Sequence, residues 1–258
     1  MSYIQLEQEG HVGILTVNRP KALNALNSEV LSELVEVLDN LDTNEIRCLI
    51  VTGAGDKSFV AGADIAEMST LSKEEGEEFG RLGNKAFRKI EVLPIPVIAA
   101  INGFALGGGN ELAMSCDIRL CAENAVFGQP EVGLGITPGF GGTQRLARLV
   151  SPGYAKQLVY SAKNIKAPEA FRIGLVNAVY PQEELMPAAK KLAAAIADAA
   201  PIAVRASKKA INEGLEQPMD EAIETEAKAF GSCFATEDQR AGMKAFLNKE
   251  KHPPYVNR

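Results

Sequence analysis

The sequence contains no tryptophan, and aromatic residues make up only 6% of its 258 positions. Proteins that bind single-stranded nucleic acids stack bases on aromatic side chains, so a surface of that kind is not expected. Acidic residues outnumber basic ones, 33 to 27, for a net charge of −6. A nucleic-acid-binding chain shows the opposite balance. A small anionic ligand remains compatible, because it needs only a local cluster of basic residues.

Histidine and cysteine are too scarce for several common kinds of catalytic site. The two histidines, His11 and His252, lie in a predicted turn and beside two prolines, and we interpret both as surface residues. A Ser-His-Asp or Cys-His relay therefore has little support. The four cysteines form no C-x-x-C pair, which argues against zinc and disulfide frameworks and predicts reduced, buried thiols. P-loop and G-x-G-x-x-G dinucleotide motifs are also absent.

Long uninterrupted hydrophobic runs are missing too. The longest apolar stretch, residues 93–109, contains two prolines, an asparagine and four glycines, which argues against a membrane span. The first residues lack the basic and apolar regions of a signal peptide. We therefore expect a cytoplasmic protein with neither a membrane nor a nucleic acid as partner.

The first half of the chain alternates between strand and helix patterns, an order that favours a parallel sheet. Strands are predicted at residues 3–7, 12–17, 48–52, 97–101 and 117–121, and helices at 28–41, 73–91 and 110–115. Residues 56–70 are predicted to form a loop, and residues 128–142 a loop rich in glycine.

After residue 143 helical patterns dominate. Helices are predicted at residues 143–149, 152–161, 182–198, 201–213, 218–230 and 236–249, and the one clear strand signal lies at 175–180. We therefore expect an α/β core over residues 1–195 that holds the active site. Residues 196–258 are expected to form a helical lobe that is too small to be an independent domain.

Two glutamates lie beside glycine-rich turns. Glu111 follows three glycines, 107–109, at a predicted strand-to-helix junction, where backbone N–H groups lack intrahelical acceptors. Glu131 lies among small and apolar residues, with no basic residue between Arg119 and Arg145. Each has an ordinary explanation, Glu111 as a first-turn acid and Glu131 as a solvated loop residue. The functional alternative is acid–base chemistry, with the pKa of Glu131 raised by burial.

A second group of backbone donors is predicted at residues 61–64, with the sequence Ala-Gly-Ala-Asp. Small residues permit a flat group to approach the backbone closely, although a tight turn packed on the core explains them equally well. Together with residues 107–109 and the two glutamates, this segment would form an oxyanion hole flanked by an acid and a base. Spacing alone leaves open whether these segments meet.

Three segments resemble signature segments of the crotonase (enoyl-CoA hydratase/isomerase) superfamily. They are FVAGADIAEM at 59–68, NGFALGGGNELA at 102–113 and FGQPEVGLG at 127–135. Shorter matches lie at 18–26, 138–146, 234–238 and 242–246, so the resemblance covers residues 3 to 255. It implies an α/β fold built as a spiral of ββα units, followed by a helical C-terminal trimerisation lobe.

The resemblance also implies a substrate, an acyl-CoA thioester. Coenzyme A would be part of that substrate, and neither a metal nor another cofactor would be required. Glu111 and Glu131 would be the catalytic residues, and the N–H groups of Ala63 and Gly108 would form the oxyanion hole. Ala61, Asp64 and Ile65 would contact adenine and pantetheine. Gln129 and Gly139 would shape the loop that positions the water. Related isomerases usually lose the glutamate that matches Glu111. The presence of both therefore favours hydration of a trans-2-enoyl-CoA to a (3S)-3-hydroxyacyl-CoA.

Other activities within the superfamily remain open. They are dehydration of a 3-hydroxyacyl-CoA, double-bond isomerisation by Glu131, and non-catalytic binding of acyl-CoA or RNA, of which the acidic balance argues against RNA. The resemblance further implies fatty-acid β-oxidation and self-association as a trimer or as a hexamer built from two trimers.

The lobe itself contains two residues with an implied role at a neighbouring copy's site. Phe246 would contact the bound acyl-CoA, and Lys249 would lie near a phosphate. A solvated lysine is the ordinary alternative for Lys249. Phe230, Phe234 and Phe246 fit burial at an interface between copies, and they fit an intrachain core equally well.

Overall fold

The computed structural model describes residues 2–258. The β-branched runs pair into a six-stranded sheet, and the expected α/β class is confirmed. Its strands, in spatial order, are β1 (Ile4–Glu9), β2 (Val12–Val17), β3 (Cys48–Gly53), β5 (Val97–Ile101), β7 (Ile118–Ala122) and β10 (Ala178–Tyr180). β1 and β2 form an antiparallel hairpin, and every other pair in this sheet is parallel.

A second, smaller sheet was not predicted from the sequence. It contains β4 (Ser58–Val60), β6 (Phe104–Leu106), β8 (Val126–Gly128) and β9 (Ile165–Lys166). The prediction of a loop over 56–70 was therefore wrong in part, because β4 and a short helix, α2 (Ile65–Met68), lie there. Strands of two or three residues are too short to show an alternating pattern. From β3 to α6, each turn of the chain adds one strand to the large sheet, one strand to the small sheet and then helix, as expected for a spiral of ββα units.

Most helices lie within a few residues of their predicted positions. They are α1 (Ser28–Asp39), α3 (Lys73–Glu91), α4 (Gly108–Ser115), α5 (Gly142–Val150), α6 (Pro152–Ser161), α7 (Ala167–Arg172), α8 (Gln182–Asp198), α9 (Pro201–Gly214), α10 (Met219–Cys233) and α11 (Glu237–Asn248). Two short 3₁₀ helices are η1 (Pro20–Ala22) and η2 (Glu131–Leu134). The exceptions are α7, η1 and η2, none of which was predicted, and the strand expected at 175–180 begins only at Ala178.

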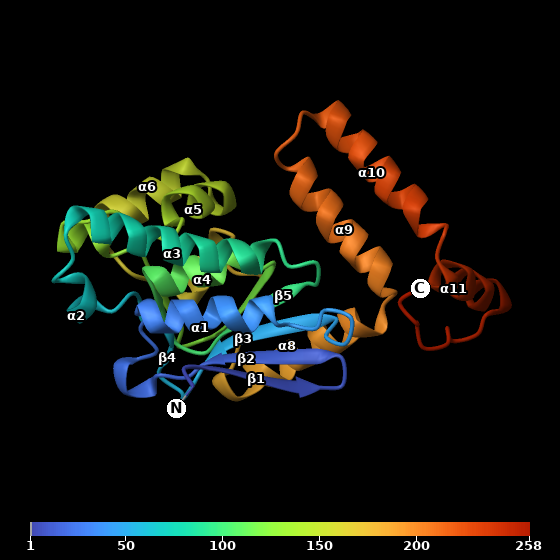
Figure 1. Cartoon of the computed structure of the whole chain (residues 1–258), viewed down its shortest axis with the longest axis horizontal. Helices are drawn as coiled ribbons and strands as arrows, with labels where there is room; N and C mark the ends of the chain where they lie inside the picture. Colours follow the sequence, from blue (N-terminus) through green and yellow to red (C-terminus); the bar gives the residue numbers. More distant parts are fainter. Residues whose placement is uncertain (1) are drawn as a thin grey trace.

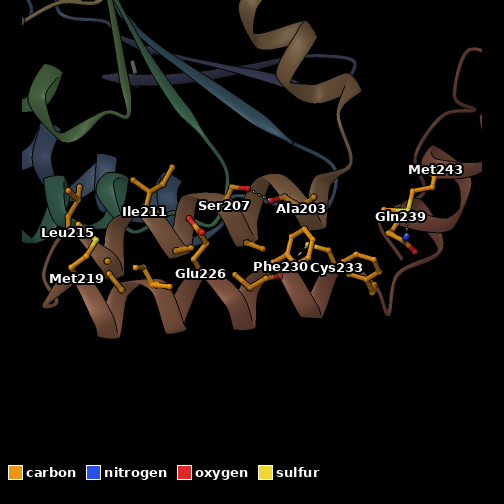
Figure 2. A pocket seen from close by; sticks show the side chains of 17 residues that line it. Ala203, Ser207, Ile211, Leu215, Met219, Glu226, Phe230, Cys233, Gln239 and Met243 are labelled. Carbon is orange, nitrogen blue, oxygen red and sulfur yellow. Dashed lines mark hydrogen bonds between the residues drawn. The ribbon is translucent and has the colours of Figure 1, made fainter. Parts of the chain in front are cut away.

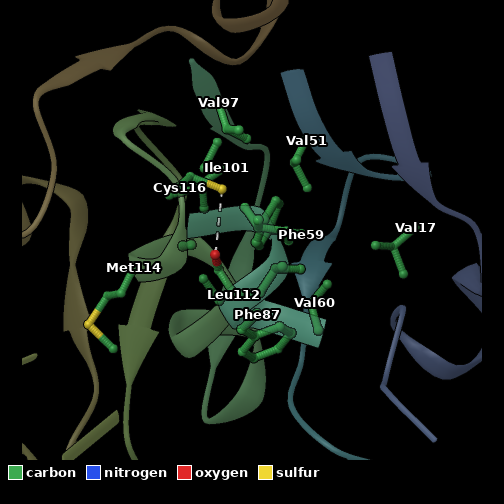
Figure 3. Packing of buried hydrophobic residues seen from close by; sticks show 14 of the residues in the cluster. Val17, Val51, Phe59, Val60, Phe87, Val97, Ile101, Leu112, Met114 and Cys116 are labelled. Carbon is green, nitrogen blue, oxygen red and sulfur yellow. Dashed lines mark hydrogen bonds between the residues drawn. The ribbon is translucent and has the colours of Figure 1, made fainter. Parts of the chain in front are cut away.

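Alternate residues of β3 enter two separate hydrophobic cores. Leu49 and Val51 belong to the larger one, which also takes in buried residues of α1, α3 and α4 and is shown around Phe59 and Phe87 in Figure 3. Cys48 and Ile50 point the opposite way, because side chains alternate along a strand. That second face is covered by a stripe of α8 with a spacing of four residues: Leu185, Ala189, Ala193 and Ala197. Its alanines favour the helix and let it lie close to the sheet.

Helices α9, α10 and α11 extend from one end of the core (Figure 1). The predicted division at residue 195 falls inside α8, whose Ala197 still packs on the sheet, so the chain leaves the core only after Asp198. One ion pair ties α9 to the core. Lys208 Nζ lies 2.7 Å from Asp117 Oδ2 and donates to the carbonyl of Ile95 at 2.9 Å.

Two further expectations from the sequence concern the cysteines and membrane-spanning helices. Cys48, Cys116 and Cys121 are buried free thiols, as predicted, whereas Cys233 is partly exposed. Among the helices of residues 2–258, none combines the length and the hydrophobicity that crossing a bilayer requires.

Candidate active site

A cavity of about 370 Å³ lies between α2, α3, the start of α4 and the segment that follows β8. Seven of the eleven residues predicted for the site line it: Ala61, Ala63, Ile65, Gly108, Glu111, Glu131 and Gly139. Apolar side chains supply much of the remaining wall, among them Met68, Phe79, Leu134, Ile136 and Phe140. The fold therefore brings together the three segments that spacing alone could not connect.

The backbone of Ala63 lies at the cavity, with its N–H directed away from the adjacent segment around Leu26. Leu26 forms a parallel bridge there, donating to the carbonyl of Gly62 and accepting from the N–H of Asp64. The carbonyl of Gly62 and the N–H of Ala63 belong to one trans peptide group, so they point in opposite directions. The N–H of Ala63 consequently points to the side opposite Leu26, where Ala63 lines the cavity.

Helix α4 begins at Gly108, which has no side-chain cap in front of it. Its first-turn N–H groups, including that of Gly108, have no intrahelical acceptor. Gly107, immediately before, has φ 48°, a left-handed conformation that favours glycine. A Cβ at Gly107 would also lie only 2.7 Å from Glu131 Oε1. Glycine at this turn thus permits both the backbone conformation and the close approach of a carboxylate.

Glu111 is held by backbone amides. Its Oε1 accepts the N–H of Phe140 at 2.9 Å and that of Gly142 at 2.6 Å, and the residue is only 1% exposed. Burial, and secondly the charge of Glu131, raise the pKa of Glu111 to about 7 against the lowering effect of the two amides and Arg145. A carboxyl group with a pKa near neutrality can exchange a proton at physiological pH.

Glu131 opens the short helix η2 and is also buried, at 8% exposed. Among the described residues its Oε2 has no hydrogen-bond partner, although it is shielded from bulk solvent. Such an oxygen at a cavity marks a place for water or a polar ligand group. Burial raises the pKa of Glu131 as well. Because two nearby carboxylates do not readily ionise together, the pair should titrate as a unit and hold one proton across part of the pH range.

Gln129 is fully buried and supports the turn before α4 from behind. With its side-chain amide oriented so that nitrogen faces the backbone, Nε2 donates to the carbonyl of Gly107 at 3.1 Å and to that of Gly128 at 2.9 Å. The carbonyl of Gly107 and the N–H of Gly108 belong to one peptide group. Gln129 therefore sets the plane of the peptide whose N–H faces the cavity.

Besides Gln129, three residues predicted for the site do not line the cavity. Asp64 caps α2 by accepting the N–H of Ala66 and pairs with Arg19 Nη1 at 2.6 Å, a contact that lowers the pKa of Asp64. Phe246, 83% exposed, lies near the end of α11, and Lys249 follows that helix. Neither approaches the cavity of its own chain.

Sequence reasoning missed how Glu111 is held. The amides of Phe140 and Gly142 were not recognised, although the glycines around them predicted a loop that backbone contacts could use. Arg145 was also missed, because a single arginine at the start of a helix carries no signal.

Within residues 2–258, no group of three or more His, Cys, Asp or Glu side chains is placed to hold a metal ion.

Residues 7–256 match the family model for enoyl-CoA hydratase/isomerase. The chain belongs to the enoyl-CoA hydratase/isomerase family. This membership confirms the resemblance found in the sequence. One relative is the short-chain-enoyl-CoA hydratase of Clostridium acetobutylicum, 58% identical over 259 residues and covering 100% of this chain and 99% of the relative. Another is the crotonyl-CoA hydratase of Syntrophomonas wolfei, 60% identical over 249 residues and 96% of each chain.

Solved structures of the same family have the same fold. The enoyl-CoA hydratase from Bacillus anthracis superimposes with a TM-score of 0.96 at 39% identity, covering all of both chains. An enoyl-CoA hydratase from Geobacillus kaustophilus gives a TM-score of 0.95 at 33% identity, over 100% of this chain and 98% of the other. The expected crotonase-like fold is therefore confirmed over the whole length.

Proposed function

We infer that this protein is an enoyl-CoA hydratase, a hydro-lyase that adds water to the trans-2 double bond of a short-chain enoyl-CoA. The observation that carries this inference is the placement of two buried glutamates, Glu111 and Glu131, on one cavity with the N–H groups of Ala63 and Gly108. Relatives named short-chain-enoyl-CoA hydratase and crotonyl-CoA hydratase, at 58% and 60% identity, support the reaction and the short acyl chain.

The first element of the proposed mechanism is the polarisation of the thioester. Its carbonyl oxygen would accept the N–H groups of Ala63 and Gly108 and would gain negative charge as water adds to Cβ. Preorganised donors stabilise that charge without reorientation, and losing one such donor typically costs about 3–4 kcal/mol of barrier. The apolar walls strengthen the effect, because they exclude water from around the oxyanion.

The second element is acid–base chemistry on one water molecule. Ionised Glu111 would accept a proton from the water as its oxygen bonds to Cβ, and the electrons of the double bond would move into the thioester enolate. Protonated Glu131 would then deliver a proton to Cα. A pair of carboxyl groups that shares one proton supplies the base and the acid together. The same groups work in reverse, so dehydration of a 3-hydroxyacyl-CoA needs no second site.

Crotonyl-CoA is the substrate for testing this function. We expect the protein to hydrate it with loss of the enoyl-thioester absorbance, and to form 3-hydroxybutyryl-CoA. The doubly substituted variant Glu111→Gln/Glu131→Gln serves as the control for spontaneous hydration and for contaminating hydratases. An unchanged absorbance at high enzyme concentration would exclude the proposed function.

We also propose that the protein self-associates as a trimer or a dimer of trimers. An apolar groove of about 680 Å³ lies along α9 and α10, which pack side by side (Figure 2). Large hydrophobic side chains on these helices and on the residue that follows each one are exposed: Ile211, Leu215, Met219, Ile223, Phe230 and Phe234. An exposed apolar surface of this extent is typical of a protein interface.

Light scattering on the purified protein tests this assembly. We expect the mass of three or six chains, and a smaller mass after Leu215→Glu combined with Phe230→Glu. Lys156→Glu on α6 adds an acidic residue away from the lobe and should leave the mass unchanged. A monomeric wild-type protein at micromolar concentration would contradict the proposal.

In such an assembly, Phe246 and Lys249 are proposed to contact the acyl-CoA of a neighbouring copy, since neither approaches the cavity of its own chain. Lys249→Ala should then raise KM for crotonyl-CoA but not for crotonyl-pantetheine, which lacks the nucleotide phosphates. Lys244→Ala is the control, because Lys244 is an exposed lysine of α11, the helix that Lys249 follows. Equal KM values for Lys249→Ala and wild type with crotonyl-CoA would contradict the proposed contact between Lys249 and a phosphate.

The expectations that the protein acts in the cytoplasm and in fatty-acid β-oxidation stay predictions.

A further inference from the structure

The segment that carries the two amides bound to Glu111 is itself held from outside the cavity. Arg145, in the first turn of α5, donates from Nη1 to the carbonyl of Phe140 at 2.9 Å. The N–H of the same Phe140 donates to Glu111 Oε1 at 2.9 Å. Both polar groups of one backbone residue are therefore occupied, one by the arginine and the other by the carboxylate.

The guanidinium of Arg145 is fixed on its other side by α3. Its Nη2 lies 3.1 Å from Glu91 Oε2, its Nε lies 3.4 Å from Glu91 Oε1, and the arginine side chain is only 12% exposed. Glu91 also pairs with Arg88 at 2.7 Å. Burial raises the pKa of Glu91, but hydrogen bonds from Arg145 and Arg88 outweigh this and hold it below its usual value. The carboxylate therefore stays ionised beside the guanidinium.

The backbone next to Phe140 is shaped around this arginine. Gly141 has φ 100°, and a Cβ at that position would overlap Arg145 Nη1. The guanidinium lies between the carboxylate of Glu91 and the carbonyl of Phe140. A planar, forked cation with several donors suits such a position, and a lysine ammonium does not reproduce it.

We propose that Arg145 is a positioning residue for hydration, which, braced by Glu91, holds residues 139–142 so that the amides of Phe140 and Gly142 fix the carboxylate of Glu111. The proposal rests on the proposed function, since it assigns Glu111 as the base. Arg145 does not line the cavity and acts through the backbone. A displacement of about 1 Å at a catalytic group can cost on the order of 100-fold in rate.

The charge of Arg145 acts in the same direction as the geometry. The charged groups that influence Glu111 are Glu131 from η2 and Arg145 from α5, and those that face Arg145 are Glu91 and Arg88 from α3. Glu131 raises the pKa of Glu111, whereas Arg145 lowers it. Removing the arginine should therefore raise the pKa of Glu111 further and leave less of the ionised base at neutral pH.

Arg145→Met, Arg145→Lys and Glu91→Gln test the role. Arg148→Met is the control, because Arg148 lies on the same helix, is exposed and bonds only to Gln144. We expect Arg145→Met to lower kcat for crotonyl-CoA by about 10- to 100-fold, with KM changed by less than about threefold. In its plot of kcat/KM against pH, the acid limb, where activity falls as the base becomes protonated, should move to higher pH by about half a unit to one unit.

Arg145→Lys keeps the charge and should return the acid limb toward the wild-type pH while restoring only part of kcat. Glu91→Gln should lower kcat by less than Arg145→Met does. A merely structural brace would lower the melting temperature without moving the acid limb. If Arg145→Met fails to fold, the same two readouts are taken from Arg145→Lys and Glu91→Gln. Wild-type kcat and an unmoved acid limb in the folded variants would overturn the proposal.

A readout independent of turnover separates this proposal from the proposed function. The carboxylate band of Glu111 is followed against pH by infrared difference spectroscopy, with Glu111→Gln as the reference. An upward pKa shift in Arg145→Met supports the positioning role even if the wild-type protein does not hydrate crotonyl-CoA. An unshifted pKa together with unchanged kcat refutes it.

Discussion

The side-chain nitrogen of Gln129 lies 3.1 Å from the carbonyl oxygen of Gly107, on the far side of the peptide group that presents the N–H of Gly108 to the cavity. Hydrogen bonds in series polarise one another, so a donor to this carbonyl makes the N–H at the other end a stronger donor. The same carbonyl also accepts the N–H of Glu111 at 2.9 Å. The proposed oxyanion hole thus has a buried support of its own.

Replacing Gln129 with methionine should weaken the oxyanion hole while keeping a side chain of similar size. We expect kcat for crotonyl-CoA to fall by about tenfold, the equivalent of one lost hydrogen bond. The direct measurement is the isotope-edited carbonyl stretch of bound butyryl-CoA, which has no double bond to hydrate. In the variant it should move toward the frequency of the free thioester. Gln157→Met, on the exposed face of α6, is the control. A wild-type stretch in Gln129→Met would contradict this role.

Glu111→Gln and Glu131→Gln should each lower hydration of crotonyl-CoA by about 100-fold or more, because each removes a group that we propose transfers a proton. Steady-state rates measure the loss, and equilibrium binding of butyryl-CoA checks that the cavity is intact. Glu123→Gln alters an exposed acid and should leave the rate unchanged. Hydration by Glu111→Gln at the wild-type rate would show that the assignment of two glutamates is wrong.

Gly142→Ala should disturb the site through one added methyl group. Its Cβ would overlap the side-chain amide of Gln129 and lie 2.7 Å from Glu111 Oε1, so the carboxylate or the backbone must move. We expect a loss of hydration on the order of 100-fold, since the carboxylate proposed as the base is displaced. Gly153→Ala in α6 is the matched control, because its Cβ meets open space. That control should stabilise the protein by about 0.5–1 kcal/mol, whereas full activity of Gly142→Ala would argue against the close packing at this site.

Glu111→Gln should stabilise the protein in a pH-dependent way. Burial, aided by Glu131, raises the pKa of Glu111 to about 7 in the folded state, above its ordinary value, so the folded state binds more protons than the unfolded state between those values. Stability of the wild type is therefore lost as pH rises across that window. The advantage of Glu111→Gln should be near zero at pH 4.5 and reach up to about 3 kcal/mol above pH 7.

Denaturant unfolding of both proteins at pH 5 and pH 8 measures this difference. Glu123→Gln removes an exposed carboxyl group and should show the same stability difference from wild type at both pH values. A Glu111→Gln variant that gains no stability relative to wild type at pH 8 would contradict the raised pKa.

Local sequence determined most of the helices and the strands of the large sheet. The capping box of Ser72 and Glu75 starts α3, and apolar residues at helical spacing carry it to Glu91. The four-residue spacing from Leu185 to Ala197 does the same for α8. These signals lie within one segment, so they can be read from the sequence without knowing what the segment packs against.

Tertiary structure alone decided how the site is assembled. Glu111 and Glu131 share a cavity because the ββα spiral stacks the turns that follow β6 and β8, and β6 and β8 are too short to predict from alternation. The sequence contained the two glutamates and the glycines beside them, and the family resemblance assigned them roles. Their pKa values and the bracing by Gln129 and Arg145 depend on burial and contact between distant segments, which arise only when the chain folds.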